Sequence, residues 1–393
     1  MKGRRMTSVD EQAELVEAVR ETVRGVTKRW DREYYLDKTA KHEAPTELYA
    51  AMAEAGLFAL GVPEELGGAG GGITATATVM EEMSRQGLPP MLYSLTSFSR
   101  QAIIRHGSPR QIEDHVVPSL TAERTFSFAL TEPDAGSNSF TISTSATRRP
   151  DGNYVLRGQK VFISGADQAD HMMVVARTTP YDQVKRKSDG ISLFIVDTSA
   201  PGISMHPLNI EWHAPERQFA VYFDDVVLPP EALIGIEGAG AASMFESLNA
   251  ERVVISAWTL GLGELALAKA VEYAKQRSPW GPPIGSYQSV AHPLARAKAQ
   301  LEAARVLTYR AAARIDAGRA EGHDANMAKL LASEAADAAV DAAIQTHGGM
   351  AFDADADIVT LWPMVRILRI APINNEMILN YISERVLGLP RSY

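Results

Sequence analysis

The stretch HMMVVA at residues 171–176, followed by ISLFIV at residues 191–196, decides the fold class of this chain. Each run is short, rich in apolar side chains and bounded by polar residues, as expected of buried β-strands. Further strand-like runs lie at residues 154–156, 160–163 and 219–223. Together they predict a β domain of roughly one hundred residues in the middle of the chain.

Helical patterns lie on both sides of this β region. The alanine-rich C-terminal part contains two long amphipathic patterns, at residues 291–317 and 325–346. Helices, then strands, then helices predict an α+β chain in three pieces. We expect an N-terminal α-helical domain at residues 1–125, a central β-barrel-like domain at residues 126–235, and a C-terminal four-helix bundle at residues 236–393.

The composition excludes several classes of function. The 393 residues include no cysteine, which rules out disulfides, thiolate nucleophiles and iron–sulfur ligation, so redox chemistry would need an organic cofactor. The histidines are scattered without metal-ligand spacing, and the net charge of -9 argues against nucleic acid as a partner. No run of apolar residues is long enough to predict a membrane span, and no apolar segment follows the basic start, so we expect a cytoplasmic protein.

Two loops at the edge of the β region carry the most distinctive chemistry. Residues 128–138 (FALTEPDAGSN) offer hydroxyls and free backbone N–H groups that could bond a heteroaromatic edge and a pyrophosphate. Residues 161–166 (VFISGA) place an aromatic ring and a hydroxyl at a strand end, where they could stack on and bond a ring system. Each loop also fits an ordinary turn, and no Rossmann, Walker or nucleophile-elbow motif is present to decide between the readings.

Taken together, the two loops resemble the acyl-CoA dehydrogenase family. The pattern Thr-Glu-Pro-x-Ala-Gly-Ser stands at residues 131–137, and Gly-x-Lys-x-x-Ile-Ser stands at residues 158–164. Further motifs of the family follow in order through most of the chain, at residues 56–57, 63–68, 81–85, 223–226, 251–252, 277–284, 287–288 and 345–349. The order also reproduces the α–β–α plan.

The resemblance implies an FAD enzyme of fatty acid metabolism that oxidises an acyl-CoA thioester to the trans-2-enoyl-CoA. In the family a glutamate takes the α-proton and the β-hydride passes to flavin N5, while hydrogen-bond donors stabilise the developing enolate oxygen. It also implies an electron-transfer flavoprotein as electron acceptor and a homotetramer. Two alternatives stay open: a flavin-dependent oxidase or monooxygenase of the same fold, and a non-catalytic relative that has lost its cofactor.

The resemblance assigns two groups of cofactor contacts. The first, in the β domain, comprises Leu130, Thr131, Gly136, Ser137, Phe162 and Ser164. The second, which would reach the adenine half of FAD from a neighbouring subunit, comprises Arg277, Trp280, Gln288, Gln345, Gly348 and Gly349. Phe162 stands where the family usually has tryptophan. Judged by its residue type alone, Arg277 could equally be a solvated cation at a helix end.

The catalytic base is the point at which the sequence departs from most of the family. Most members carry Glu-Gly-Thr near the C-terminus, but residues 369–378 (RIAPINNEMI) lack it. A minority places the base in a Leu-x-x-Glu-Arg segment, and residues 248–252 match that pattern. We therefore expect Glu251 to be the base, although it could instead pair with Arg252 or with another charge on its helix.

The expected substrate contacts are Ser137, Arg252, Trp258, Asn374 and Asn375. Backbone N–H groups at the two asparagines would supply the second donor to the enolate oxygen. Trp258 would lie on the same helix face as Glu251, where it could block the deep end of the acyl pocket and favour short acyl groups. An indole packed in the core of the bundle is the alternative.

Overall fold

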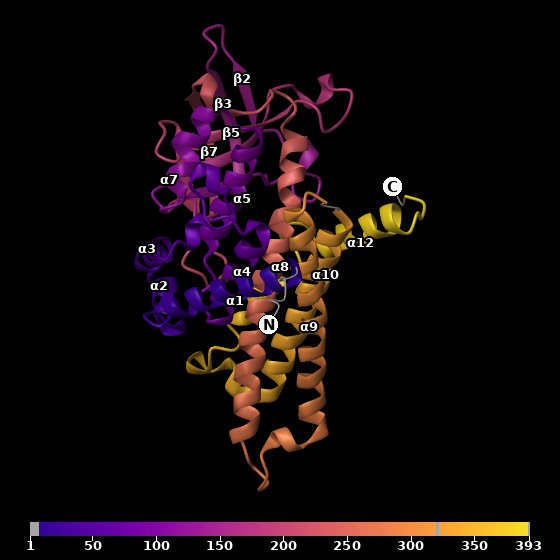
Figure 1. Ribbon diagram of the computed structural model, residues 1–393. Coiled ribbons are helices and arrows are strands. Elements are labelled where there is room, and N and C mark those ends of the chain that lie inside the picture. Colours follow the sequence, from indigo (N-terminus) through magenta and orange to yellow (C-terminus); the bar gives the residue numbers. More distant parts are fainter. Residues whose placement is uncertain (1–7, 320–321, 392–393) are drawn as a thin grey trace, which may run out of the picture.

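The computed structural model describes residues 8–319 and 322–391, so the basic start of the chain lies outside the described residues. Helices come first, a sheet follows, and helices complete the chain (Figure 1). This order confirms the predicted α–β–α architecture.

The N-terminal part is helical from Ser8 to Ser119. Its α-helices are α1 (Ser8–Thr27), α2 (Arg32–Lys41), α3 (Thr46–Glu54), α4 (Gly72–Arg85), α5 (Met91–His106), α6 (Pro109–Gln111) and α7 (Val117–Ser119). Nearly every residue of α4 is buried, because α4 packs against α1 on one side and against the C-terminal helices on the other. Helix α4 therefore belongs to the core that joins the N-terminal and C-terminal parts.

The central part is one mixed sheet. Its strands are β1 (Phe126–Ala129), β2 (Ser145–Arg148), β3 (Tyr154–Ser164), β4 (His171–Arg177), β5 (Ile191–Asp197), β6 (Ile203–Pro207), β7 (Gln218–Leu228) and β8 (Leu233–Ile234). The strand order is β6-β7-β3-β2-β4-β5-β8, and β1 pairs with β4 in parallel. All seven residues of β4 are buried, which explains why its sequence is a continuous apolar run rather than an alternating one.

The C-terminal part consists of long helices packed side by side. It contains α8 (Gly240–Gln276), α9 (Gln288–Asp316) and α10 (Gly322–His347), followed by α11 (Leu361–Ile367), which packs on α8 and α10, and α12 (Asn375–Tyr381). By length and composition the stretch Leu248–Gln276 of α8 is apolar enough to cross a membrane. However, 78% of its most apolar window is buried inside the protein, as is typical of a core helix.

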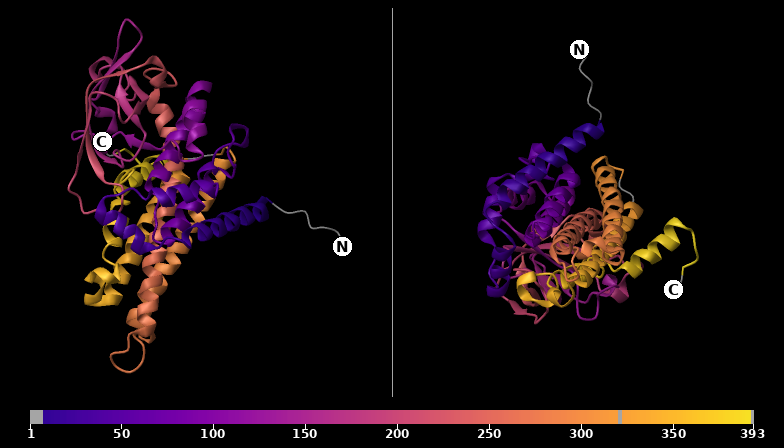
Figure 2. Two further views of the ribbon diagram at one scale, coloured as in Figure 1. Left: turned by 90° about the vertical axis from the view of Figure 1, so that its left-hand side faces the viewer. Right: turned by 90° about the horizontal axis from the view of Figure 1, so that it is seen from below.

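The two ends of α8 lie in different surroundings. Its start packs against β5 and its middle packs against α4, whereas its last turns reach the end of the bundle away from the sheet (Figures 1 and 2). At that far end the loop between α8 and α9 projects from the molecule. The protein therefore carries two separate groups of predicted site residues, one near the sheet and one at the far end of the bundle.

Candidate functional site

The loop at residues 130–137 is held by hydrogen bonds to the C-terminal half of β3. The N–H of Val161 donates to the carbonyl of Thr131 at 2.9 Å. The ammonium of Lys160 donates to the carbonyl of Leu130 at 2.8 Å and forms a salt bridge with Glu132, also at 2.8 Å. These contacts bring the two predicted flavin-binding loops together.

The Glu132–Lys160 pair is buried and was not assigned a role from the sequence. Burial by itself would raise the pKa of Glu132, but the Lys160 charge and hydrogen bonds from Ser143 and Thr144 lower it to about 2. Burial lowers the pKa of Lys160 to about 8, against the opposing effect of Glu132. Because breaking a buried ion pair leaves one charge uncompensated, this pair holds the loop in place strongly. The signal in the sequence was a lysine inside an otherwise strand-like run.

Phe162 has an unusual backbone conformation. It lies in a register irregularity between β3 and β7, and its φ is +60°, a left-handed value that bulky residues rarely adopt. As a result its ring points to the surface, with 59% of the residue exposed. The side-chain amide of Gln218 donates to the nearby Ser164 hydroxyl at 2.8 Å. Strain of this kind is tolerated where an exposed ring has a function, which makes Phe162 a candidate stacking residue.

A hydrogen bond joins the β-domain loop to the C-terminal segment. The side-chain amide of Asn374 donates to the hydroxyl of Ser137 at 2.8 Å. The Asn374 side-chain oxygen also caps α12 by accepting from the N–H of Met377 at 2.8 Å. Two residues that are far apart in the sequence, and that were both predicted to contact substrate, are therefore neighbours.

Asn375 corrects one prediction. Its backbone N–H donates to the carbonyl of Arg369 at 3.0 Å, so it is already used inside the turn and is not free for an enolate oxygen. Its buried side chain accepts from Lys329 at 2.9 Å and bonds Ser333. Asn375 therefore anchors the turn to α10, and among the described residues no hydrogen bond uses the neighbouring Asn374 N–H.

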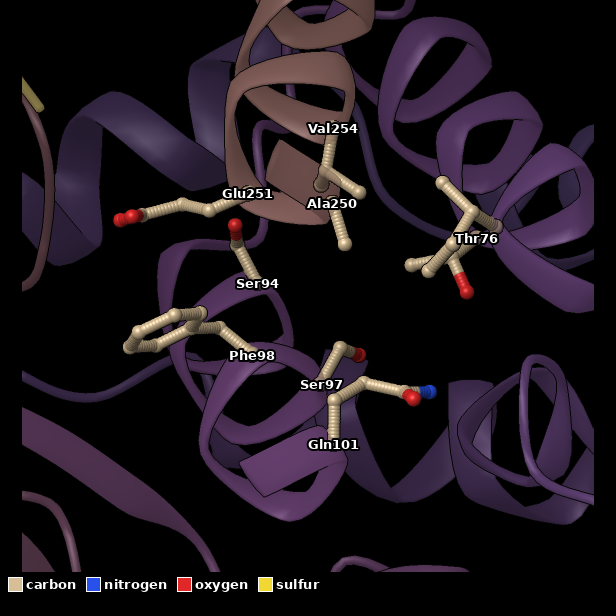
Figure 3. A pocket seen from close by; sticks show the side chains of 9 residues that line it. Thr76, Ser94, Ser97, Phe98, Gln101, Ala250, Glu251 and Val254 are labelled. Carbon is tan, nitrogen blue, oxygen red and sulfur yellow. The ribbon is translucent and has the colours of Figure 1, made fainter. Parts of the chain in front are cut away.

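Glu251 lies on α8 and lines a cavity between α4, α5 and α8 (Figure 3). The cavity is narrow, about 10 Å³, which is room for about one water molecule. One carboxylate oxygen of Glu251, Oε2, is buried without a hydrogen-bond partner. Burial raises the pKa of Glu251 to about 7, although the nearby Arg252 charge opposes this.

Arg252 does not pair with Glu251. Its guanidinium donates to the side-chain oxygen of Asn249 at 2.8 Å, one turn back on α8. Within residues 8–319 and 322–391 no salt bridge joins Glu251 to a cation, and its Oε2 has no hydrogen-bond partner there. Burial lowers the pKa of Arg252, against the effect of Glu251. The structure therefore does not contain the alternative, an ion pair between Glu251 and Arg252.

Trp258 lies in the core rather than at the cavity. It is 3% exposed and packs edge-on against Trp212, with ring centroids 6.4 Å apart. Val254, one turn closer to Glu251, lines the cavity instead. The prediction that Trp258 closes the acyl pocket is therefore replaced by its alternative, an indole packed inside the protein.

The second group of predicted cofactor residues lies at the far end of the bundle. Arg277 follows α8, 26 residues after Glu251, which corresponds to about 39 Å along a helix. Tyr273 stacks on His347 at 4.4 Å, which places the end of α8 beside the end of α10. The residues of this group are Arg277, Trp280, Gln288, Gln345, Gly348 and Gly349, all of them exposed. Within one subunit the structure does not bring them near the β-domain loops.

No group of residues suited to bind a metal ion occurs in the described ranges. The β domain presents an exposed aromatic ring in a strained turn beside a firmly held loop. The Glu251 carboxylate lies at the separate cavity between α4, α5 and α8, and no cation among the described residues pairs with it.

Comparison with known proteins agrees with this geometry. Three family descriptions match in succession: "Acyl-CoA dehydrogenase, N-terminal domain" over residues 9–123, "middle domain" over residues 127–226, and "C-terminal domain" over residues 238–387. The curated acyl-CoA dehydrogenase FadE12 of Mycobacterium tuberculosis is 41% identical, over 97% of this chain and 98% of its own.

Solved structures have the same fold. Butyryl-CoA dehydrogenase from Megasphaera elsdenii matches with a TM-score of 0.88 and 28% identity, over 98% of this chain and all of its own. An FAD complex of PigA matches with a TM-score of 0.87 and 28% identity, over 98% of this chain and 99% of its own. The chain belongs to the acyl-CoA dehydrogenase family.

Proposed function

We propose that this enzyme removes the α-proton and the β-hydride of an acyl-CoA to give the trans-2-enoyl-CoA, with Glu251 as the base. One observation carries the proposal: the half-buried Glu251 places a buried carboxylate oxygen, Oε2, at a cavity between α4, α5 and α8, and no cation among the described residues pairs with it. Its pKa of about 7 suits a general base, since proton transfer is most efficient when the pKa of the base lies near the working pH.

The residues around the two loops fit FAD. The exposed ring of Phe162 and the hydroxyl of Ser164 lie beside the loop held by Lys160. When bound, FAD supplies the acceptor for the β-hydride. A side chain at Gly136 would meet nothing within 4 Å, so the loop leaves room for a phosphate to approach its backbone.

The exposed residues at the far end of the bundle support an assembly. Because about 39 Å of helix separates them from Glu251, we propose that they contact the adenine half of FAD in a neighbouring subunit of a homotetramer. Their exposure in a single subunit fits this role: Trp280 is 77% exposed. We further propose an electron-transfer flavoprotein as the electron acceptor and a cytoplasmic location.

The donors to the enolate oxygen involve the turn before α12. The Asn374 N–H is the remaining backbone candidate, since the Asn375 N–H is already bonded. Asn374 is held by its bonds to Ser137 and to Met377, so its orientation is fixed before substrate binds. Such preorganisation is what stabilises an enolate in a transition state.

Anaerobic mixing of the FAD-loaded enzyme with a panel of acyl-CoAs tests the proposal. We expect bleaching of the flavin absorbance for the wild type and none for Glu251→Gln, with FAD content unchanged. Glu272→Gln, an exposed glutamate on the same helix, is the matched control and should bleach normally. A flavin that no acyl-CoA reduces would point to a monooxygenase, a protein that cannot hold FAD would point to a non-catalytic relative, and bleaching by Glu251→Gln would exclude Glu251 as the base.

A further inference from the structure

Lys329 is a buried lysine of α10 that faces the turn before α12, and these two helices pack against each other (Figure 1). The residue is 1% exposed, and its ammonium donates to the carbonyl of Ile373 at 2.6 Å and to the side-chain oxygen of Asn375 at 2.9 Å. Both acceptors are neutral, and in the described ranges no salt bridge joins Lys329 to a carboxylate. A neutral donor would hold the same turn without the cost of burying a charge. The positive charge therefore has a cost that holding the turn does not explain.

The carbonyl of Ile373 belongs to the same peptide group as the N–H of Asn374, the proposed donor to the enolate oxygen. This peptide is trans, because within the described ranges the cis bond is Ala371–Pro372. In a planar trans peptide the C=O and the N–H point in opposite directions. Lys329 therefore lies on one side of the peptide group, and the Asn374 N–H points away from it on the other side.

An ammonium at one end of a peptide group makes the other end a better hydrogen-bond donor. Electron density is drawn toward the carbonyl oxygen and the N–H becomes more positive, because hydrogen bonds in a chain polarise one another. The bond from Lys329 is charge-assisted, and such bonds are about twice as strong as neutral ones. The effect is largest when the group that accepts from the N–H carries a negative charge. It therefore stabilises an enolate more than the neutral thioester carbonyl, as catalysis requires.

We propose that Lys329 is a positioning residue whose charge stabilises the substrate enolate through the peptide group of Ile373 and Asn374. Its ammonium holds this peptide group in place and polarises it, and the Asn374 N–H makes the contact with the enolate oxygen. The inference rests on the proposed function, because it takes the Asn374 N–H as a donor to that oxygen.

The charges around Lys329 fit this role. Burial, together with the charges of Arg252 and Arg369, lowers the pKa of Lys329 to about 7, against the opposing effect of Glu376. A negative charge that develops beyond the peptide group favours the protonated form of the lysine. Enolate formation and protonation of Lys329 therefore reinforce each other.

Acetoacetyl-CoA bound to the FAD-loaded enzyme tests the inference. Loss of its α-proton gives an enolate, whereas its β-carbon is a ketone with no hydride to transfer, so the flavin stays oxidised. The ultraviolet difference absorbance of the bound enolate, followed against pH, gives the pKa of the bound ligand. We expect the wild type to lower this pKa below that of free acetoacetyl-CoA. Lys329→Gln should raise it by about one pH unit, which is a tenfold weaker stabilisation of the enolate, and Lys329→Arg should restore most of the difference.

Asn375→Asp separates the charge of Lys329 from its hold on the turn. Aspartate has nearly the shape of asparagine and still accepts from Lys329, so the bond to the Ile373 carbonyl is kept, but its negative charge offsets the ammonium. If Lys329 only holds the turn, this variant leaves the pKa of the bound ligand unchanged, whereas our inference predicts a rise. The variant also decides the question if Lys329→Gln does not fold.

Lys269→Gln is the control, because Lys269 of α8 also donates to backbone carbonyls, those of Ala356 and Asp357, each at 3.1 Å. These carbonyls lie outside the turn before α12, so the control should leave the pKa of the bound ligand unchanged. A wild-type pKa in Asn375→Asp or in folded Lys329→Gln, or an equal rise in Lys269→Gln, would overturn the inference. If acyl-CoAs nevertheless bleach the wild-type flavin, the proposed function stands without it; if none does, the proposed function fails as well.

Discussion

Replacing Glu251 by glutamine should stabilise the protein although it removes the proposed base. Burial raises the pKa of Glu251 from 4.5 to about 7, so the folded protein holds this proton more tightly than the unfolded chain does. Stability is therefore lost as the pH rises from 4.5 through about 7, because the carboxylate must ionise in a desolvated position where no cation among the described residues pairs with it. Glutamine has nearly the same shape and no charge, and so avoids this loss.

The magnitude follows from the shift. The pKa of Glu251 rises from 4.5 in the unfolded chain to about 7 in the folded protein. Above pH 7 this difference lowers the free energy of unfolding by about 3 kcal/mol, and below pH 4.5 it has almost no effect. Thermal unfolding of the wild type and of Glu251→Gln at pH 5 and pH 8.5 measures it. We expect the advantage of the variant in unfolding midpoint to be small at pH 5 and clear at pH 8.5.

Glu272→Gln serves as the control, because Glu272 is exposed on the same helix and should show no such pH-dependent gain. The reasoning is refuted if the advantage of Glu251→Gln is the same at both pH values, or if the variant is less stable than the wild type at pH 8.5. The first result would mean that the carboxylate does not ionise in this window. The second would mean that it has a cation partner when charged.

Three further sets of substitutions test other parts of the site. Lys160→Met should cost about 3–5 kcal/mol, because it leaves a buried carboxylate unpaired, and should lower FAD content; an unchanged unfolding midpoint would contradict this. Val254→Phe should shift kcat/KM toward shorter acyl-CoAs, because Val254 lines the cavity. Trp258→Phe should leave the chain-length preference unchanged. The opposite result for the two variants would mean that Trp258, and not Val254, limits the length of the acyl group. Arg277→Ala should weaken FAD binding in equilibrium dialysis without changing the circular dichroism, because the side chain is exposed; unaltered binding would argue against a contact across subunits.

Much of the fold could be predicted because its signals are local. The apolar runs at residues 171–176 and 191–196 are strands β4 and β5, and a turn that contains Asp151 and Gly152 connects β2 to β3. Gly152 has a φ of +91°, which a hairpin turn of this kind favours. Periodicity and turn residues need no knowledge of distant segments, so they determine the element order.

What a side chain faces could not be predicted in the same way. Val254 and Trp258 lie on one face of α8 by spacing, but only Val254 lines the cavity, because Trp258 meets Trp212 from the loop before β7. The N–H of Asn375 donates a hydrogen bond to the carbonyl of Arg369, and the position of that carbonyl depends on the fold of the turn. Tertiary packing, which spacing along the chain does not encode, decides these contacts.

Glu251 and Arg252 show how the structure resolves a pair that the sequence leaves ambiguous. Consecutive residues on a helix point about 100° apart, so the two side chains have different neighbours: Arg252 bonds Asn249, and Glu251 lines the cavity. Had they paired, the cation would have lowered the pKa of the carboxyl group and made it a weaker base. Left without a partner, Glu251 destabilises the fold and keeps its pKa near 7. A group that costs stability and is held at a cavity is best explained by the chemistry it performs there.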